Sequence, residues 1–74
     1  MIQMSNVNKF YLAVEERFQS EDERFGESLF NELANQHPRL ANAIRGTQLD
    51  PFYCDDSTDP RVLKCVEFIE ENLG

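Results

Sequence analysis

The chain has 74 residues, with seven lysines and arginines against fourteen aspartates and glutamates, so that its formal net charge is −7. A chain this short makes one small domain, residues 1–74, and leaves little room for both a packed core and a catalytic cleft, which disfavours an enzyme. A negative surface repels nucleic acid and anionic membranes, whereas it attracts a basic protein partner.

Cysteine content and hydropathy indicate the cellular compartment. The chain has two cysteines, Cys54 and Cys65, and a single histidine, His37. A structural zinc site takes four nitrogen or sulfur ligands, and one chain supplies only three such side chains. Two cysteines do not make a disulfide framework, so we expect reduced thiols in the cytosol. No uncharged run approaches the roughly 20 residues of a membrane span, and the N-terminus lacks the pattern of a signal peptide. We therefore expect a cytoplasmic protein.

The first predicted helix covers residues 5–19. Ser5 suits the N-cap position at its start. Apolar residues then return at the spacing of one helical face, and Leu12 and Ala13 widen that face beyond a narrow stripe. The residues of this face are Val7, Phe10, Tyr11, Val14 and Phe18.

The second predicted helix covers residues 21–36. Ser20 and Glu23 match the capping-box pattern S-x-x-E, which places a helix start at this point. Gly26 interrupts the helical pattern at a cost of about 1 kcal/mol relative to alanine, which either a close helix crossing or a tolerated solvent-facing glycine would explain. The predicted inner face consists of Phe25, Leu29, Phe30 and Leu33.

Two further helices are predicted over residues 38–45 and 60–73. Pro38 suits the first position of a helix, and Gly46 suits the left-handed residue that follows one. Asp59 before a proline repeats the signal for a helix start. The inner faces are Leu40, Ala41 and Ile44 in the earlier helix, and Val62, Val66, Ile69 and Leu73 in the later one.

Each predicted helix carries an apolar stripe that another helix must cover, and no strand pattern of any length is present. We therefore predict an all-α fold, a compact bundle of about four short helices. The last two helices are joined by one long acidic and aromatic loop, residues 47–59.

A calcium site is one interpretation of this loop. Asp55, Ser57 and Asp59 stand at alternate positions, as the first three ligands of an EF-hand loop do. That loop requires glycine at its sixth position and glutamate at its twelfth, where this chain has Pro60 and Val66. We therefore predict no metal ligands and no cofactor.

Catalysis is a second interpretation, and the residues argue against it. Asp55 and Asp56 are adjacent in a polar stretch, where the burial that separates the pKa values of paired carboxylates is not expected. His37 has no nucleophile beside it in the sequence. The two aspartates disfavour a thiolate at Cys54 by like charge. We therefore predict no catalytic residue.

The two aromatic residues of the loop allow two readings. Phe52 can fold back and close one end of the bundle, with the hydroxyl of Tyr53 left in water. Alternatively both rings face solvent beside an acidic rim and form a protein-contact patch. The predicted protein-binding surface consists of Phe52, Tyr53, Asp55, Asp56, Glu67, Glu70 and Glu71.

The stretch ANAIRGTQLDPFYCDD resembles small proteins encoded in tailed-phage genomes, over about residues 25–70. The shared residues are Arg45, Gly46, Thr47, Asp50, Pro51, Phe52 and Tyr53. The resemblance implies a viral origin and expression in a bacterial cytoplasm, and it carries over no activity and no site residue. By analogy, short acidic phage proteins modulate host proteins by binding them.

The leading functional hypothesis is therefore a non-enzymatic protein–protein interaction module. The alternative is a homo-oligomeric structural or virion-associated component, because the apolar face of residues 5–19 exceeds what a narrow stripe requires. A DNA mimic is weaker, since seven bases offset the fourteen acids. A metal-binding domain is weaker for the reason given above.

Overall fold

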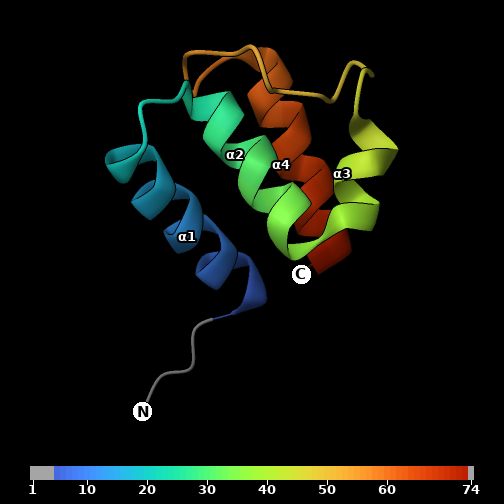
Figure 1. Cartoon of the computed structure of the whole chain (residues 1–74). Coiled ribbons are helices and arrows are strands. Elements are labelled where there is room, and N and C mark those ends of the chain that lie inside the picture. Colours follow the sequence, from blue (N-terminus) through green and yellow to red (C-terminus); the bar gives the residue numbers. More distant parts are fainter. Residues whose placement is uncertain (1–4, 74) are drawn as a thin grey trace.

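The computed structural model describes residues 5–73, which form four α-helices and contain no strand (Figure 1). The predicted all-α bundle of about four helices is therefore confirmed. The predicted bounds agree with the structure to within one residue, except at the second helix, which begins four residues later than expected. The helices are α1 (Asn6–Ser20), α2 (Phe25–Gln36), α3 (Pro38–Ile44) and α4 (Pro60–Leu73).

The late start of α2 overturns the predicted capping box at residues 20–23. Ser20 belongs to α1, and its hydroxyl donates to the carbonyl oxygen of Arg17 at 3.4 Å, so it closes one helix and does not open the next. A short connection follows, and the cap of α2 is Arg24. The Glu27 carboxylate accepts from the Arg24 amide at 3.3 Å, which satisfies a donor at the start of α2.

Three predicted helix-end residues are confirmed. The Ser5 hydroxyl accepts from the Asn8 amide at 3.1 Å and caps α1. The Asp59 carboxylate accepts from the Arg61 amide at 2.9 Å at the start of α4. Gly46 follows α3 with a φ of 75°, in the left-handed region that favours glycine.

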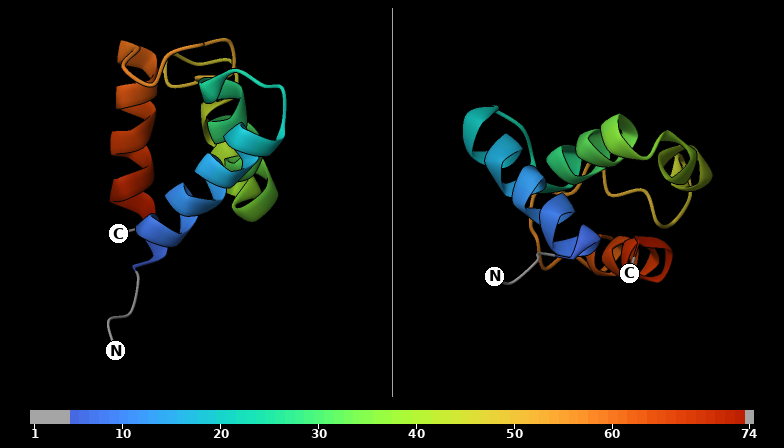
Figure 2. Two further views of the ribbon diagram at one scale, coloured as in Figure 1. Left: turned by 90° about the vertical axis from the view of Figure 1, so that its left-hand side faces the viewer. Right: turned by 90° about the horizontal axis from the view of Figure 1, so that it is seen from below.

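The helices pack around a shared interior rather than in a row. Figure 2 shows α4 on one side of the molecule and α2 with α3 on the other, while α1 crosses diagonally from the end of α4 to the start of α2. The loop 47–59 runs along one end of the bundle and reaches the start of α2 before it returns to α4 (Figure 1). This course brings residues near position 53 beside residues near position 25.

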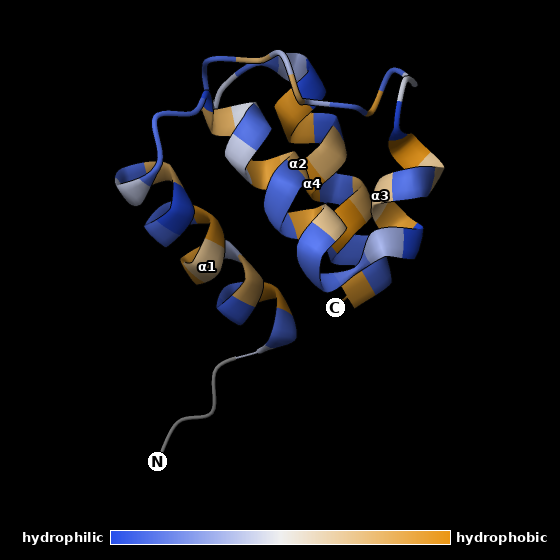
Figure 3. Ribbon diagram, in the orientation of Figure 1, coloured by the Kyte–Doolittle hydropathy of each residue, from blue (hydrophilic) through white to orange (hydrophobic). Residues whose placement is uncertain are grey.

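One hydrophobic core joins all four helices and the loop. Figure 3 shows hydrophobic residues alternating with hydrophilic ones along each helix, as amphipathic helices require. The clearest differences from the predicted faces are that Cys65 is fully buried where Val66 is only half-buried, and that Phe18 remains 42% exposed. The buried core residues are Phe10, Val14, Leu29, Phe30, Leu33, Ala41, Ile44, Cys54, Val62, Cys65 and Ile69.

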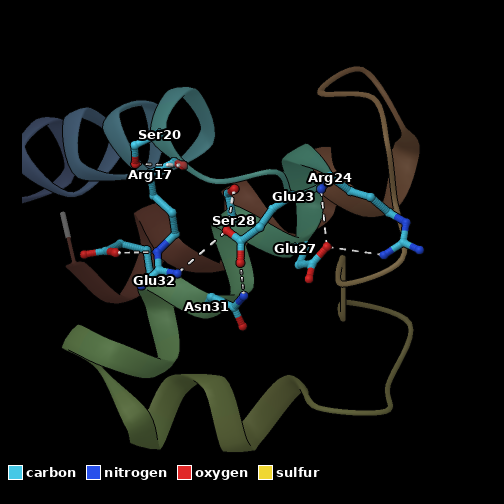
Figure 4. A network of polar contacts seen from close by, with 8 residues as sticks. All are labelled: Arg17, Ser20, Glu23, Arg24, Glu27, Ser28, Asn31 and Glu32. Carbon is cyan, nitrogen blue, oxygen red and sulfur yellow. Dashed lines mark hydrogen bonds and ion pairs between the residues drawn. The ribbon is translucent and has the colours of Figure 1, made fainter.

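A polar network joins the end of α1 to α2 (Figure 4). Arg17 donates through its Nε to the Glu32 carboxylate at 3.0 Å. The Glu23 carboxylate accepts from the Ser28 hydroxyl at 3.0 Å and from the Asn31 amide group at 2.8 Å. This network fixes the connection that carries Arg24 toward the loop.

Candidate functional site

The loop 47–59 is a series of tight turns. Three backbone amides donate to the carbonyl oxygen of another loop residue three positions earlier, which is the hydrogen bond of a β-turn. The pairs are Asp50 to Thr47 at 3.1 Å, Cys54 to Pro51 at 2.9 Å, and Asp59 to Asp56 at 3.1 Å. A loop with this many internal bonds presents its side chains in set positions.

Two of the four aspartates in the loop accept hydrogen bonds from its backbone. The Asp50 carboxylate accepts from the amide of Gly46 at 2.8 Å and from the amide of Phe52 at 3.0 Å. Asp56 accepts from the Thr58 amide at 3.0 Å, and this hydrogen bond holds the pKa of the Asp56 carboxyl below its usual value. These carboxylates shape the loop, as aspartate commonly does in turns.

Gly26 holds the loop against the start of α2. Its amide donates to the Cys54 carbonyl oxygen at 2.9 Å, so the loop supplies a partner for one of the free donors of the first helical turn. A β-carbon at Gly26 would overlap the Pro51 carbonyl oxygen and lie 2.9 Å from that of Cys54. The close approach is therefore that of a loop rather than a helix, and the solvent-facing interpretation was wrong.

Phe52 and Tyr53 occupy the two central positions of the turn formed by residues 51–54. Phe52 is half-buried and packs edge-on against the core residue Phe30, with ring centroids 6.0 Å apart. Tyr53 is 78% exposed, and its ring stands 5.1 Å from the Phe52 ring. The turn thus directs one ring inward and the next outward.

Arg24 borders Tyr53 on one side. Its guanidinium carbon lies 5.8 Å from the centroid of the Tyr53 ring. Its Nε lies 3.4 Å from the Asp55 carboxylate, and another guanidinium nitrogen lies 3.3 Å from that of Glu27. Since Arg24 caps α2, these contacts link the helix start to the tip of the loop.

Two shallow hollows flank Tyr53. The Tyr53 groove has a volume of about 310 Å³, and its lining residues are Phe30, Arg45, Asp50, Phe52 and Tyr53. The second hollow has a volume of about 240 Å³, and its lining residues are Gly46, Thr47, Gln48, Asp50, Tyr53 and Arg61. Tyr53 is therefore a ridge between two depressions.

The hollows carry a local positive charge. The Arg45 guanidinium lies 5.4 Å from the centroid of the Phe30 ring. Neither Arg45 nor Arg61 forms an ion pair with any residue between 5 and 73. Two arginines against the single carboxylate of Asp50 leave a net charge of +1 on these linings, in a chain whose net charge is −7.

An acidic cleft of about 530 Å³ adjoins Arg24, and four of its six lining residues are acids. These lining residues are Phe18, Asp22, Glu23, Arg24, Glu27 and Asp55. The predicted acidic rim therefore lies on the Asp55 side of the loop. The surroundings of Tyr53 differ in charge from one side to the other.

The other predicted surface residues lie farther along α4. Glu67, Glu70 and Glu71 are all exposed. Glu70 follows Pro60 by ten residues, about 15 Å along a helix, so it lies toward the opposite end of α4 from the loop. The structure therefore brings together the loop residues of the predicted surface and places the three glutamates of α4 apart from them.

Glu70 instead lies close to Tyr11 of α1. Burial of the Tyr11 hydroxyl, followed by the nearby negative charge of Glu70, raises the Tyr11 pKa to about 12. The hydroxyl is shielded from solvent, and the Glu70 carboxylate does not reach it with regular hydrogen-bond geometry. The contact helps to seal α1 against α4 and offers no group for chemistry.

The thiols are buried and poorly reactive. Burial, followed by the negative charge of Asp59, raises the Cys54 pKa above its ordinary value. Burial raises the Cys65 pKa to about 12. The disfavoured thiolate at Cys54 was predicted from Asp55 and Asp56, whereas its main cause is desolvation. Within residues 5–73, no three His, Cys, Asp or Glu side chains are arranged to hold a metal ion.

Arg45 and Arg61 are the site residues that sequence reasoning missed. Arg45 lies two residues before the start of the loop 47–59, and Arg61 lies two residues after its end. A base at each end of a loop that doubles back was the available signal, because the ends of such a loop approach its middle. Their common neighbour, Tyr53, became apparent only from the fold.

Comparison with models of known protein families, with curated proteins and with solved structures found no match. None of the helices within residues 5–73 is long and apolar enough to cross a membrane. The geometry around Tyr53 therefore carries the functional proposal.

Proposed function

We propose that this protein is a non-enzymatic protein–protein interaction module whose contact surface is centred on Tyr53. The observation that carries this proposal is a tyrosine ring that is 78% exposed yet supported by Phe52 and Arg24. An aromatic side chain that is already ordered loses little conformational freedom on binding, and tyrosine is enriched among the residues that dominate interface energies.

The charge pattern supports a basic partner on the acidic side of this surface. The net charge of −7 attracts such a partner over a distance of about 10 Å at ordinary salt, and Asp55 with the acidic cleft provides a local contact. Asp56 extends this side, and the acids of α4 add to the long-range attraction. In line with the resemblance to phage proteins, the proposed partner is a host protein in a bacterial cytoplasm.

The ionisable groups support a role without catalysis. Both thiols are buried with raised pKa values, which is the reverse of an activated nucleophile. The carboxylates of Asp50 and Asp56 accept hydrogen bonds from backbone amides of their own loop, and the Asp59 carboxylate accepts from the Arg61 amide at the start of α4. The side chains near Tyr53 are thus suited to contact and not to bond breaking.

Site-specific photo-cross-linking tests the proposal. A photoreactive phenylalanine analogue at position 53 should form a discrete adduct in bacterial lysate, whereas the same analogue at Leu63, which is 52% exposed on α4, should not. Excess unlabelled protein should compete for the adduct, and the Tyr53→Ala protein should compete poorly. Equal adducts at both positions, or equal competition by the variant, would refute this surface.

Self-association is a second candidate, favoured by half-exposed apolar residues outside the Tyr53 region. Leu12 is 46% exposed on α1, and Leu63 is 52% exposed on α4. A homo-oligomer would bury such residues. Multi-angle light scattering of the wild type and of a Leu12→Gln variant decides this: a dimer that the variant dissociates supports the second candidate.

A further inference from the structure

We infer that the Tyr53 groove takes a carboxylate-bearing segment of a partner protein, with an apolar side chain in the groove and an adjacent Asp or Glu side chain at Arg45. This inference rests on the proposed function and specifies the chemistry of the segment that Tyr53 contacts.

The shape and lining of the groove indicate the apolar element. Three of its five lining residues are aromatic, and they form a continuous chain in which Phe30 contacts Phe52 and Phe52 contacts Tyr53. Its volume of about 310 Å³ lies at the lower end of the range of about 300–1,000 Å³ for small-molecule pockets. It therefore suits one or two side chains of a docked segment.

The charges indicate the acidic element. Arg24 is already paired with Asp55 and Glu27, whereas Arg45 has no ionic partner among residues 5–73. The only acid of the groove, Asp50, has one carboxylate oxygen engaged by the Gly46 amide and the other by the Phe52 amide. An incoming carboxylate can therefore pair with Arg45, whose guanidinium offers a fork of donors.

The whole-molecule charge selects a protein segment over a nucleic acid. Phosphates would also pair with arginine, and bases would stack on tyrosine. A nucleic acid, however, carries one charge per nucleotide past a surface of net charge −7, whereas a protein segment can carry a single carboxylate among neutral or basic residues. Such a segment can meet Arg45 on one side of Tyr53 and Asp55 on the other.

Selection from a library of random peptides with amidated C-termini tests the inference, with wild type and Arg45→Glu as baits. The wild type should enrich an aromatic or leucine next to Asp or Glu, and Arg45→Glu should enrich Lys or Arg at the same place. Lys9→Glu, an equal charge change on α1, should select the wild-type motif. Arg45→Gln should lose the acidic preference without acquiring a basic one.

Affinities of one selected peptide and its Glu→Gln version give a second measurement. The acid should strengthen binding to wild type by about three- to ten-fold, and the difference should vanish in Arg45→Gln. Peptides that need Tyr53 but show no acidic preference would overturn this inference and leave the proposed function intact. Peptides indifferent to Tyr53→Ala would overturn both, and displacement by a single-stranded oligonucleotide would overturn the choice of a protein segment.

Discussion

At the scale of the residue, two neighbouring aromatic side chains of the loop have different roles. Phe52 packs on Phe30 and belongs to the core, while Tyr53 belongs to the surface. The two residues occupy the adjacent central positions of one β-turn, yet only the Phe52 ring reaches the core residue Phe30. The inner ring thereby fixes the position of the outer one.

Alanine substitutions should separate these two roles. Tyr53→Ala should change the free energy of unfolding by less than about 0.5 kcal/mol, because the ring is mostly exposed. Phe52→Ala should cost about 2 kcal/mol, because it removes half-buried ring surface from the core. Urea unfolding followed by circular dichroism measures both, and equal losses would contradict the division.

The two thiols should react slowly with thiol reagents in the folded protein. At pH 8 the raised pKa values of Cys54 and Cys65 leave almost no thiolate, and burial denies access. Ellman's reagent should therefore react slowly with the native protein and promptly with both thiols in guanidinium chloride. A prompt reaction of one thiol in the native state would show that the loop opens readily.

At the scale of the element, the loop and α2 form one unit through Gly26. The helix receives a carbonyl from Cys54, and the loop lies so close that no side chain fits between them. The two carbonyl oxygens that approach Gly26 belong to the backbone, so they cannot rotate away as the end of a flexible side chain can. This contact sets the position of the turn that carries Tyr53.

Gly26→Ala should therefore destabilise the protein by about 2 kcal/mol, although alanine favours a helix over glycine. Gly46→Ala is the control, since its β-carbon would meet no atom within 4 Å and only the positive φ would be strained, at a cost of about 1 kcal/mol. Chemical denaturation compares the two. A larger loss at Gly46 would show that the loop is not tightly seated on α2.

The tie between α1 and α2 should make stability depend on pH. Hydrogen bonds from Gln36 and Arg17 hold the pKa of Glu32 below its usual value. Their contribution is present above the unfolded pKa of about 4.3 and is lost as the pH falls through the lowered folded pKa. Glu32→Gln should show a smaller fall in unfolding midpoint between pH 6 and pH 3 than wild type, and equal falls would exclude Glu32 as a contributor.

The helices could be predicted from the sequence because their signals are local. Ser5, Gly46 and Asp59 act within one turn of the backbone, and apolar spacing depends only on helical geometry. The capping box at Ser20 failed because the Ser20 hydroxyl donates to the Arg17 carbonyl oxygen, and the Glu23 carboxylate is engaged by Ser28 and Asn31. The partners Ser28 and Asn31 lie outside the four-residue pattern, so the pattern could not indicate them.

The site could be predicted only in part, because it depends on contacts between distant residues. Tyr53 was singled out by its type and by the loop around it. Arg45 and Arg61 lie near Tyr53 only because the loop doubles back. The loop can do so because Gly26 has no side chain and leaves room for it. No local spacing encodes that approach.

At the scale of the whole molecule, charge and packing argue for a protein that stays apart from its own copies. Every copy carries a net charge of −7, so copies repel one another. The half-exposed apolar residues are divided between α1, which carries Leu12 and Phe18, and α4, which carries Leu63. Scattered single residues of this kind are normal on monomeric proteins.

Light scattering should therefore give the mass of one chain, independent of protein concentration and unchanged from low to moderate salt. Salt would screen the repulsion, so a mass that doubles only at high salt would show that charge alone keeps the copies apart. A dimer at low salt would contradict the prediction and favour the second candidate function.

The bond between Gly26 and Cys54 also has a consequence for synthesis. Cys54 follows Gly26 by 28 residues, so the first turn of α2 lacks this carbonyl partner until that later part of the chain has been synthesised and released. The early half of the polypeptide is therefore incomplete by itself. Maturation of the bundle should finish in a single late step, when the loop arrives and places Tyr53 on the outside.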